Sequence, residues 1–149
     1  MNDKEREMLA TINAARAAHG LPAVRPDARL SAAARGHAED MAAHPGMIHT
    51  GSDGSDGGRR ILDAGYVPRE WLEAVGWGWE GNAAAMVEWW LRSPDHRHIL
   101  LEENLPDVGV GYADGGPWGH YWTVDFGRTD VPPPQPGYST VNLPVVLGS

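Results

Sequence analysis

The stretch Trp90-Leu-Arg-Ser93-Pro94-Asp95-His96-Arg97-His98-Ile99-Leu100 decides how this chain is organised, because one helix must end in it and another must begin. Pro94 disfavours αR geometry at Ser93, so we expect the preceding helix to end just before Ser93. Pro94 can then be the first residue of a new helix with Ser93 as its N-cap. On that helix His96 and His98 point about 200° apart, since successive residues advance about 100°. Only one of the two can therefore face a given cleft.

Composition sets the limits on fold and function. The chain has 149 residues, of which 42% are hydrophobic, which is enough for one domain with a real core. Its 12 Lys and Arg residues against 20 Asp and Glu residues give a formal charge of −8, which argues against nucleic-acid binding and against adhesion to an anionic membrane surface. The absence of cysteine excludes disulfides, thiolate zinc sites and a cysteine nucleophile. No apolar run approaches membrane-spanning length, and no signal-peptide pattern begins the sequence, so we expect an intracellular protein or the processed part of an exported one.

Periodicity and capping residues predict further helices. Apolar residues at helical spacing indicate a helix over Asp3–His19 with Asp3 as its cap, and a second helix that Asp27 caps and His44 ends. His37 lies among the apolar positions of that second helix, and we interpret it as a hydrogen-bonded packing residue. The glycine-rich stretch 51–58 is expected to form turns and to cap a short helix over Arg59–Ala64. A last helix, capped by Asn82, leads into Trp90.

Alternation predicts three strands. Trp71, Glu73, Val75, Trp77 and Trp79 would share one face of a strand, and Glu73 is the anomaly on that face. A carboxylate there must be paired, coordinated or at the rim of a cleft, unless the whole face is solvated. Two further strands, over 107–112 and 119–127, are expected to form a hairpin.

The end of the chain is proline-rich. We expect residues 1–130 to form the domain and residues 131–149 an extended tail, in which 141–147 can still dock as an edge strand.

Helices at the start and a strand pair at the end indicate an α+β fold. The motifs, in their order and spacing, resemble the bacterial branch of the CAP superfamily of SCP-like or PR-1-like domains over residues 6–127. They are Ile12-Asn-Ala-Ala-Arg16, His49-Thr-Gly-Ser-Asp-Gly-Ser55, Ala64-Gly-Tyr66, Glu73, Trp90-Leu-Arg-Ser-Pro-Asp-His-Arg97, Val108-Gly-Val-Gly-Tyr112 and Tyr121-Trp-Thr-Val-Asp-Phe-Gly127.

The resemblance implies a three-layer α-β-α sandwich with a small antiparallel sheet between helices, and a shallow cleft that in several members binds a divalent metal, often zinc. His49 and His96 match cleft histidines, and Glu73 sits where members carry the Glu of a Gly-Glu-Asn run. The second carboxylate of animal and plant members falls at Ser93, so the metal set here is His49, Glu73 and His96. Two imidazoles and one carboxylate suffice for zinc with an open fourth position. The neighbours of this cleft are expected to be Ser93, Asp95 and His120.

Three functions remain open. The leading interpretation is a non-catalytic extracellular binding module, monomeric and secreted, periplasmic or on the cell surface, whose ligand is a lipid, a cell-wall component or a protein. The alternative is a zinc-dependent hydrolase of peptide or cell-wall substrates that would use Glu73, His49 and His96, although no complete catalytic signature is present. In the third, the cleft is vestigial and a tryptophan-rich surface mediates protein contacts.

Overall fold

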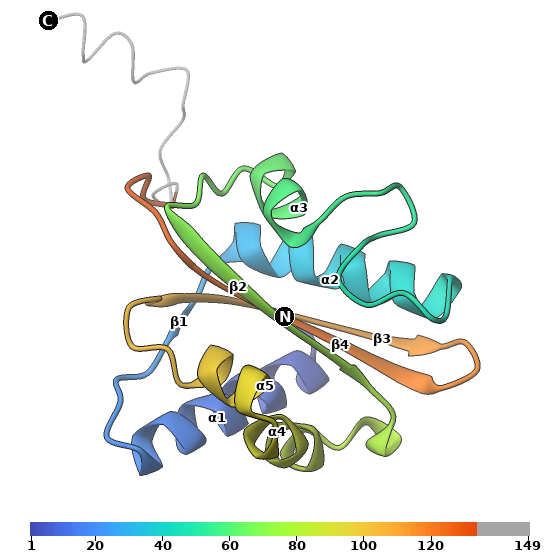
Figure 1. The fold of residues 1–149 in the computed structure, drawn as a ribbon, viewed down its shortest axis with the longest axis horizontal. Coiled ribbons are helices and arrows are strands. Elements are labelled where there is room, and N and C mark those ends of the chain that lie inside the picture. The colour runs from blue at the N-terminus through green and yellow to red at the C-terminus, as the bar shows by residue number, and fades with distance from the viewer. Residues whose placement is uncertain (134–149) are drawn as a thin grey trace, which may run out of the picture.

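The computed structural model describes residues 1–133 and shows a sheet between two layers of helices (Figure 1). Helices α2 and α3 cover one face of the sheet, and α1, α4 and α5 cover the other. This is the expected three-layer sandwich. The elements are α1 (Asp3–Ala18), β1 (Arg25–Pro26), α2 (Ala28–Ala43), α3 (Gly57–Asp63), β2 (Glu70–Trp77), a 3₁₀ turn (Trp79–Gly81), α4 (Ala83–Arg92), α5 (Pro94–Leu100), β3 (Asp107–Gly115) and β4 (Gly119–Arg128).

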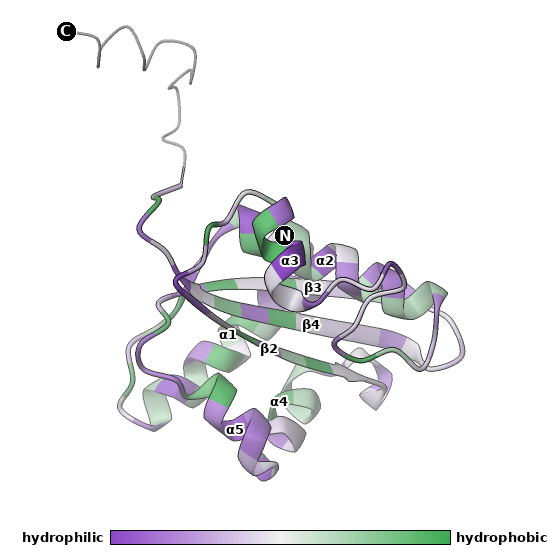
Figure 2. Cartoon of the chain, turned by 45° about the horizontal axis from the view of Figure 1, so that its top comes forward, coloured by the Kyte–Doolittle hydropathy of each residue, from purple (hydrophilic) through white to green (hydrophobic). Residues whose placement is uncertain are grey.

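The strand order is β1-β3-β4-β2, and β4 is antiparallel to both of its neighbours. The expected hairpin is therefore confirmed as β3–β4. The sheet is mixed rather than wholly antiparallel, because the two-residue strand β1 pairs in parallel with β3. Backbone bonds from Arg25 to Pro106 and from Asp27 to Val108 hold it there. Strand β2 forms the other edge of the sheet, and no strand of residues 1–133 lies beyond it (Figure 2).

The two faces of the sheet pack differently. The face toward α1, α4 and α5 carries the main apolar core, to which Trp90, Trp122 and Phe126 contribute large buried side chains. On the other face α2 lies directly against β3, because Gly109 and Gly111 have no side chain there. A Cβ atom on Gly109 would lie 2.0 Å from the backbone of α2. This face also holds the buried polar residues of the candidate site.

The capping predictions are confirmed for α2, α3 and α4, where Asp27, Asp56 and Asn82 accept backbone hydrogen bonds. The expected cap of α1 is wrong by one residue. Asn2 is the N-cap and forms a reciprocal capping box with Glu5, which puts Asp3 inside the helix.

The predicted strand over 71–79 ends at Trp77 because the next four residues all have a positive φ. Gly78 and Gly81 adopt positive φ freely, but Trp79 at φ 54° and Glu80 at φ 51° do so at a steric cost. The chain therefore turns away from the sheet. Trp79 does not continue the alternating face as expected.

Most of the predicted tail lies outside the described residues, as does the segment 141–147 that was expected to dock. Within residues 1–133, none of the helices combines the length and the hydropathy that crossing a bilayer requires.

Candidate functional site

Glu73 is buried in the middle of β2 and faces the layer of α2 and α3, with 4% of the residue exposed. Arg60 of α3 donates from Nη2 to both carboxylate oxygens, at 3.0 and 2.9 Å. The Nδ1 atom of His49, on the loop before α3, lies 3.0 Å from Oε1. Glu73 is therefore paired, and the alternative of a solvated face is wrong.

Asp125 stands directly opposite Glu73, on β4, and is fully buried. No N–H or O–H group of the described residues donates to either of its carboxyl oxygens. Burial, the charge of Glu73 and a hydrogen bond to Glu73 all raise the pKa of Asp125 well above its ordinary value. The raised pKa favours the protonated form of Asp125, since an ionised, unpaired carboxylate would be very costly here.

The pKa of Glu73 moves in the opposite direction. Burial raises it, but the hydrogen bonds from His49 and Asp125 and the charge of Arg60 outweigh burial and lower the pKa to about 2. Glu73 is the one full negative charge of the pair, and Arg60 is its counter-charge. Because Arg60 neutralises Glu73, little of the negative charge of Glu73 is left to attract a cation from the cleft.

His37 has the packing role that its place on α2 predicted. The residue is 1% exposed, and its Nε2 atom makes a hydrogen bond with the carbonyl oxygen of Ile48. Burial is the first cause that lowers the pKa of His37. The bond fixes the backbone immediately before His49, so His37 positions the site from beneath without being part of its surface.

The stretch from Trp90 to Leu100 folds as predicted, with a difference at Ser93. Ser93 occupies the N-cap position of α5, but its hydroxyl makes no capping bond and instead lies 3.0 Å from Nδ1 of His96. Burial, and next the nearby charge of His49, lower the pKa of His96. His98 points elsewhere, with Nε2 3.6 Å from Glu102. The prediction that only one of the two histidines faces the site is confirmed.

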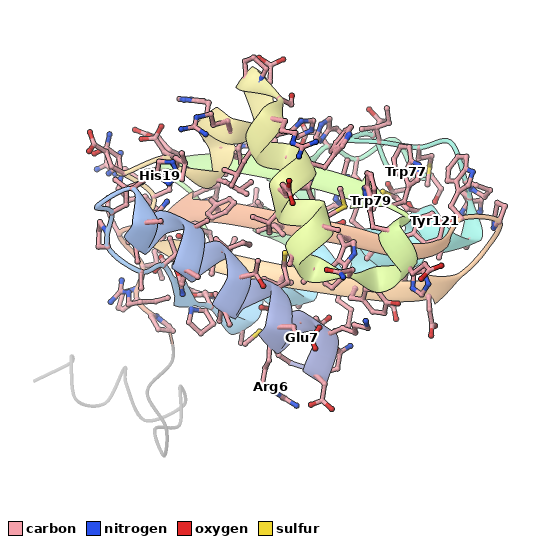
Figure 3. The ribbon with its side chains drawn as sticks, turned by 90° about the horizontal axis from the view of Figure 1, so that it is seen from below. Arg6, Glu7, His19, Trp77, Trp79 and Tyr121 are labelled. Carbon is pink, nitrogen blue, oxygen red and sulfur yellow. The ribbon has the colours of Figure 1, made fainter. Side chains whose placement is uncertain are left out.

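A largely apolar pocket of about 540 Å³ opens beside His96, at the edge of the sheet. It is lined by Ile48, Val75, Gly76, Trp77, Trp79, Met86, Trp89 and His96. Trp79 is 51% exposed, Trp89 is 45% exposed and Ile48 is 49% exposed. Figure 3 shows Trp77 and Trp79 at the same end of the molecule as Tyr121. These large apolar side chains are therefore unusually open to solvent.

The aromatic side chains around the pocket are braced by stacking. The ring of Trp89 lies 5.4 Å from that of His96, and Trp77 stacks on Trp118 at 5.0 Å with nearly parallel planes. Trp118 is itself 41% exposed but does not line the pocket. Trp118 therefore supports Trp77 from outside the pocket.

The predicted metal set is only partly assembled. His49 and Glu73 are hydrogen-bonded, and His96 is near enough to His49 to feel its charge. Across residues 1–133, however, no three His, Asp or Glu side chains are grouped so that they could hold a metal ion. The observed arrangement does not fit a three-ligand zinc site, because Glu73 is committed to Arg60.

The expected cleft neighbours have separate environments. Ser93 bonds the ring of His96, Asp95 is exposed to solvent, and the Nδ1 atom of His120 pairs with the hydroxyl of Tyr112. None of the three lines the pocket.

Sequence reasoning missed Arg60 and Asp125. Arg60 gave no signal, because an arginine on a short surface helix is ordinary. Asp125 did give one. It is a carboxylate that alternates with Trp122, Val124 and Phe126 on a strand buried on both faces, which is the same kind of anomaly as Glu73.

Comparisons with known proteins agree with this fold. Residues 9–126 match the sequence profile of the CAP family, described as the cysteine-rich secretory protein family. The chain is 33% identical over 109 residues to the Bacillus subtilis protein YlbC, an uncharacterized membrane protein, with 72% of this chain aligned. It spans only 31% of the length of that relative.

Two solved structures are similar. An outer surface protein of Borrelia burgdorferi superposes with a TM-score of 0.78 at 19% identity, over 87% of this chain and 95% of that one. An extracellular protein of Bacillus anthracis that contains an SCP domain gives a TM-score of 0.77 at 25% identity, over 85% of this chain and 40% of that one.

Proposed function

Because the chain belongs to the CAP family, the cysteine-rich secretory protein family, we propose that it is a non-catalytic extracellular binding module whose ligand occupies the tryptophan-lined pocket. The observation that carries the proposal is the pocket itself, in which Trp79 and Trp89 stay about half exposed around an apolar cavity. A cavity of this size, apolar with a few polar groups at its wall, has the properties of a ligand site. The extracellular location is supported by the similar Bacillus anthracis protein, which is extracellular and contains an SCP domain.

The chemistry beside the pocket favours binding over hydrolysis. A hydrolase needs a group that moves a proton and a group that stabilises an oxyanion. Glu73 is neutralised by Arg60 and does not line the pocket, which leaves His96, the one titratable side chain of the described residues that lines it, and the neighbouring His49. Such a pair can donate or accept a hydrogen bond from a ligand.

The proposal is tested with three probes, one for each ligand class. Decanoate, a chitin tetrasaccharide and a capped apolar heptapeptide are added to protein labelled with nitrogen-15, and the indole N–H signals of the 7 tryptophans are followed by NMR. We expect at least one probe to shift Trp77, Trp79 and Trp89 and to leave Trp71, which does not line the pocket, nearly unchanged.

Turnover is measured in the same samples by mass spectrometry, with and without zinc. Intact probes support a binding module. Cleavage that a chelator abolishes would contradict the proposal and favour the hydrolase. Shifts confined to tryptophans outside the pocket would contradict it as well.

Metal binding by His49, Glu73 and His96 stays a prediction, and it requires Glu73 to leave Arg60. If it occurs, zinc raises the melting temperature of the wild type and not of His49→Ala or His96→Ala. Binding would weaken in acid, because protonated imidazoles do not coordinate metal. An equal rise in all three proteins, or none in the wild type, would end this prediction.

A further inference from the structure

The free edge of β2 borders the pocket. Gly78 donates its N–H to the carbonyl of His120, which places residue 78 in a hydrogen-bonded pair with β4. In an antiparallel ladder such pairs alternate with pairs whose backbone groups point away from the partner strand. The backbone N–H and C=O groups of Val75 and Trp77 therefore point out of the sheet.

A side-chain contact confirms this direction. The indole N–H of Trp90 donates to the carbonyl oxygen of Val75 at 2.9 Å, from the side opposite β4. The native fold thus satisfies one of the outward groups of this segment by a dedicated buried side chain. Within residues 1–133, the N–H of Val75 and both backbone groups of Trp77 have no protein partner.

These unpaired groups lie at the wall of the pocket, since Val75, Gly76 and Trp77 all line it. Val75 is only 4% exposed and is covered within the fold, so the backbone groups of this edge that a ligand can reach are those of Trp77. A buried backbone group without a partner costs free energy that a suitable ligand can recover. An acyl chain would fill the cavity and leave these groups unpaired. An extended peptide offers N–H and C=O groups at the same spacing as a strand.

We propose that the pocket receives an extended peptide segment of a partner protein, which pairs with the backbone N–H and C=O groups of Trp77 at the edge of β2 and inserts one apolar side chain among Trp79, Met86 and Trp89. This inference rests on the proposed function and names its ligand class. Strand addition of this kind draws affinity from main-chain bonds and specificity from the pocket for one side chain. The edge available is short, because Trp90 already holds the carbonyl of Val75, so about three peptide residues pair.

The test selects peptides from a random heptapeptide library on the wild-type domain and counter-selects on the Trp79→Ala/Trp89→Ala double variant. The best peptide is then N-methylated at one backbone position at a time, which removes single N–H donors and keeps every side chain. We expect affinity to fall at least tenfold at the position that faces the carbonyl of Trp77, and little at the two adjacent positions, whose N–H groups point away from β2. Hydrogen exchange at the amide of Trp77 slows in the complex.

Matched variants give the control. Trp89→Ala should weaken the selected peptide at least tenfold, whereas Leu62→Ala, which removes an exposed apolar side chain of α3 outside the pocket, should change affinity less than twofold. Affinity that is indifferent to N-methylation at every position, or a library with no enrichment on the wild type over the double variant, would overturn the inference. If decanoate or the chitin tetrasaccharide still shifts the pocket indoles in that case, the binding module stands and only its peptide ligand is wrong.

Discussion

At the scale of single residues, the buried charge of Glu73 depends on Arg60, which contacts both carboxylate oxygens and has only 12% of its side chain exposed. The buried carboxyl groups of Glu73 and Asp125 lie opposite each other, and the guanidinium of Arg60 is the positive charge beside them. Because Arg60 can compensate only one negative charge, the raised pKa of Asp125 favours its protonated form, and no donor among the described residues reaches its oxygens. The site is therefore built to hold one charge in a fixed place.

Arg60→Met should remove the counter-charge and leave Glu73 buried and unpaired. We expect a loss of about 3 kcal/mol in the free energy of unfolding, measured with urea at pH 7. Arg59→Met is the matched control. Its partner Asp63 is exposed and adjacent on the same helix, so the loss there should stay below about 0.5 kcal/mol. Equal losses in the two variants would contradict the account of the pair.

Asp125→Asn should reveal the protonation of Asp125 through the pH dependence of stability. The folded pKa is raised above the ordinary 3.8, so the wild type loses stability as pH rises above 3.8, where only the unfolded chain ionises. Asparagine does not titrate, and its amide can still donate to Glu73. The stability of the variant relative to the wild type should therefore rise between pH 3 and 7. A relative stability that falls over this range would mean that Asp125 is ionised in the fold.

Glu73 contributes with the opposite sign. Its folded pKa is lowered from 4.5 to about 2, so its contribution is present above pH 4.5 and is lost as pH falls toward 2. Arg60→Met and Asp125→Asn are therefore compared with the wild type in the same pH series.

Sequence alone selected His49, Glu73 and His96 as candidates, because each stands in a motif or breaks an alternation, and the structure places His49 beside Glu73. It placed His37 correctly in the core, because that residue recurs with apolar neighbours on one helix face. Arg60 escaped prediction, since its partner lies on a strand and only the folded chain brings the two together. The pairing of Glu73 by an arginine is the physical reason that a metal-ligand group is not assembled within residues 1–133.

At the scale of elements, the contact between α2 and β3 depends on two glycines. Gly109→Ala would place a Cβ atom 2.0 Å from the backbone carbon of Leu30, which cannot move without shifting the whole helix. We expect a loss of about 3 kcal/mol or failure to fold. Gly36→Ala, on the exposed side of α2 with no atom within 4 Å, should instead stabilise by about 0.5–1 kcal/mol. Thermal unfolding measures the stability of both variants. Equal changes at Gly109 and Gly36 would contradict this packing of α2 on β3.

The turn that contains Trp79 is strained, and a substitution of the next residue, Glu80, can measure that strain. Glu80 has φ 51° and ψ 30° and makes no hydrogen bond through its side chain within the described residues. Glu80→Gly should raise the free energy of unfolding by about 1 kcal/mol, because glycine adopts this conformation without a steric cost. Glu7→Gly, inside α1, should lower it by about the same amount. A loss at both positions would show that the turn is not strained.

The elements themselves followed from the sequence where capping residues and periodicity agreed, as in α2, α4 and the β3–β4 hairpin. The predicted bounds were wrong where neighbouring residues outside the predicted pattern determined the local conformation. Asn2 displaced Asp3 as a cap because Glu5 completes its box, and β2 stops early because four consecutive residues with positive φ follow it. Strand β1 is too short to show any pattern.

At the scale of the whole molecule, the main core lies on the side of the sheet covered by α1, α4 and α5, and the candidate pocket opens at the β2 edge, between the two helix layers. The buried polar residues of the candidate site lie under α2 and α3. The order and spacing of motifs along the chain predicted this sandwich, because together they resemble one family with one fold. The pocket could not be predicted, since it joins a loop, an edge strand, a strained turn and two helices that are separate in sequence.

The most direct test of the account is a crystal structure of the domain grown with the probe that binds best among the three ligand classes. We predict density for the probe between Trp79 and Trp89, against the edge of β2, with Glu73 still bonded to Arg60. Density for the probe at any other surface, with the tryptophan-lined pocket empty, would contradict the central claim.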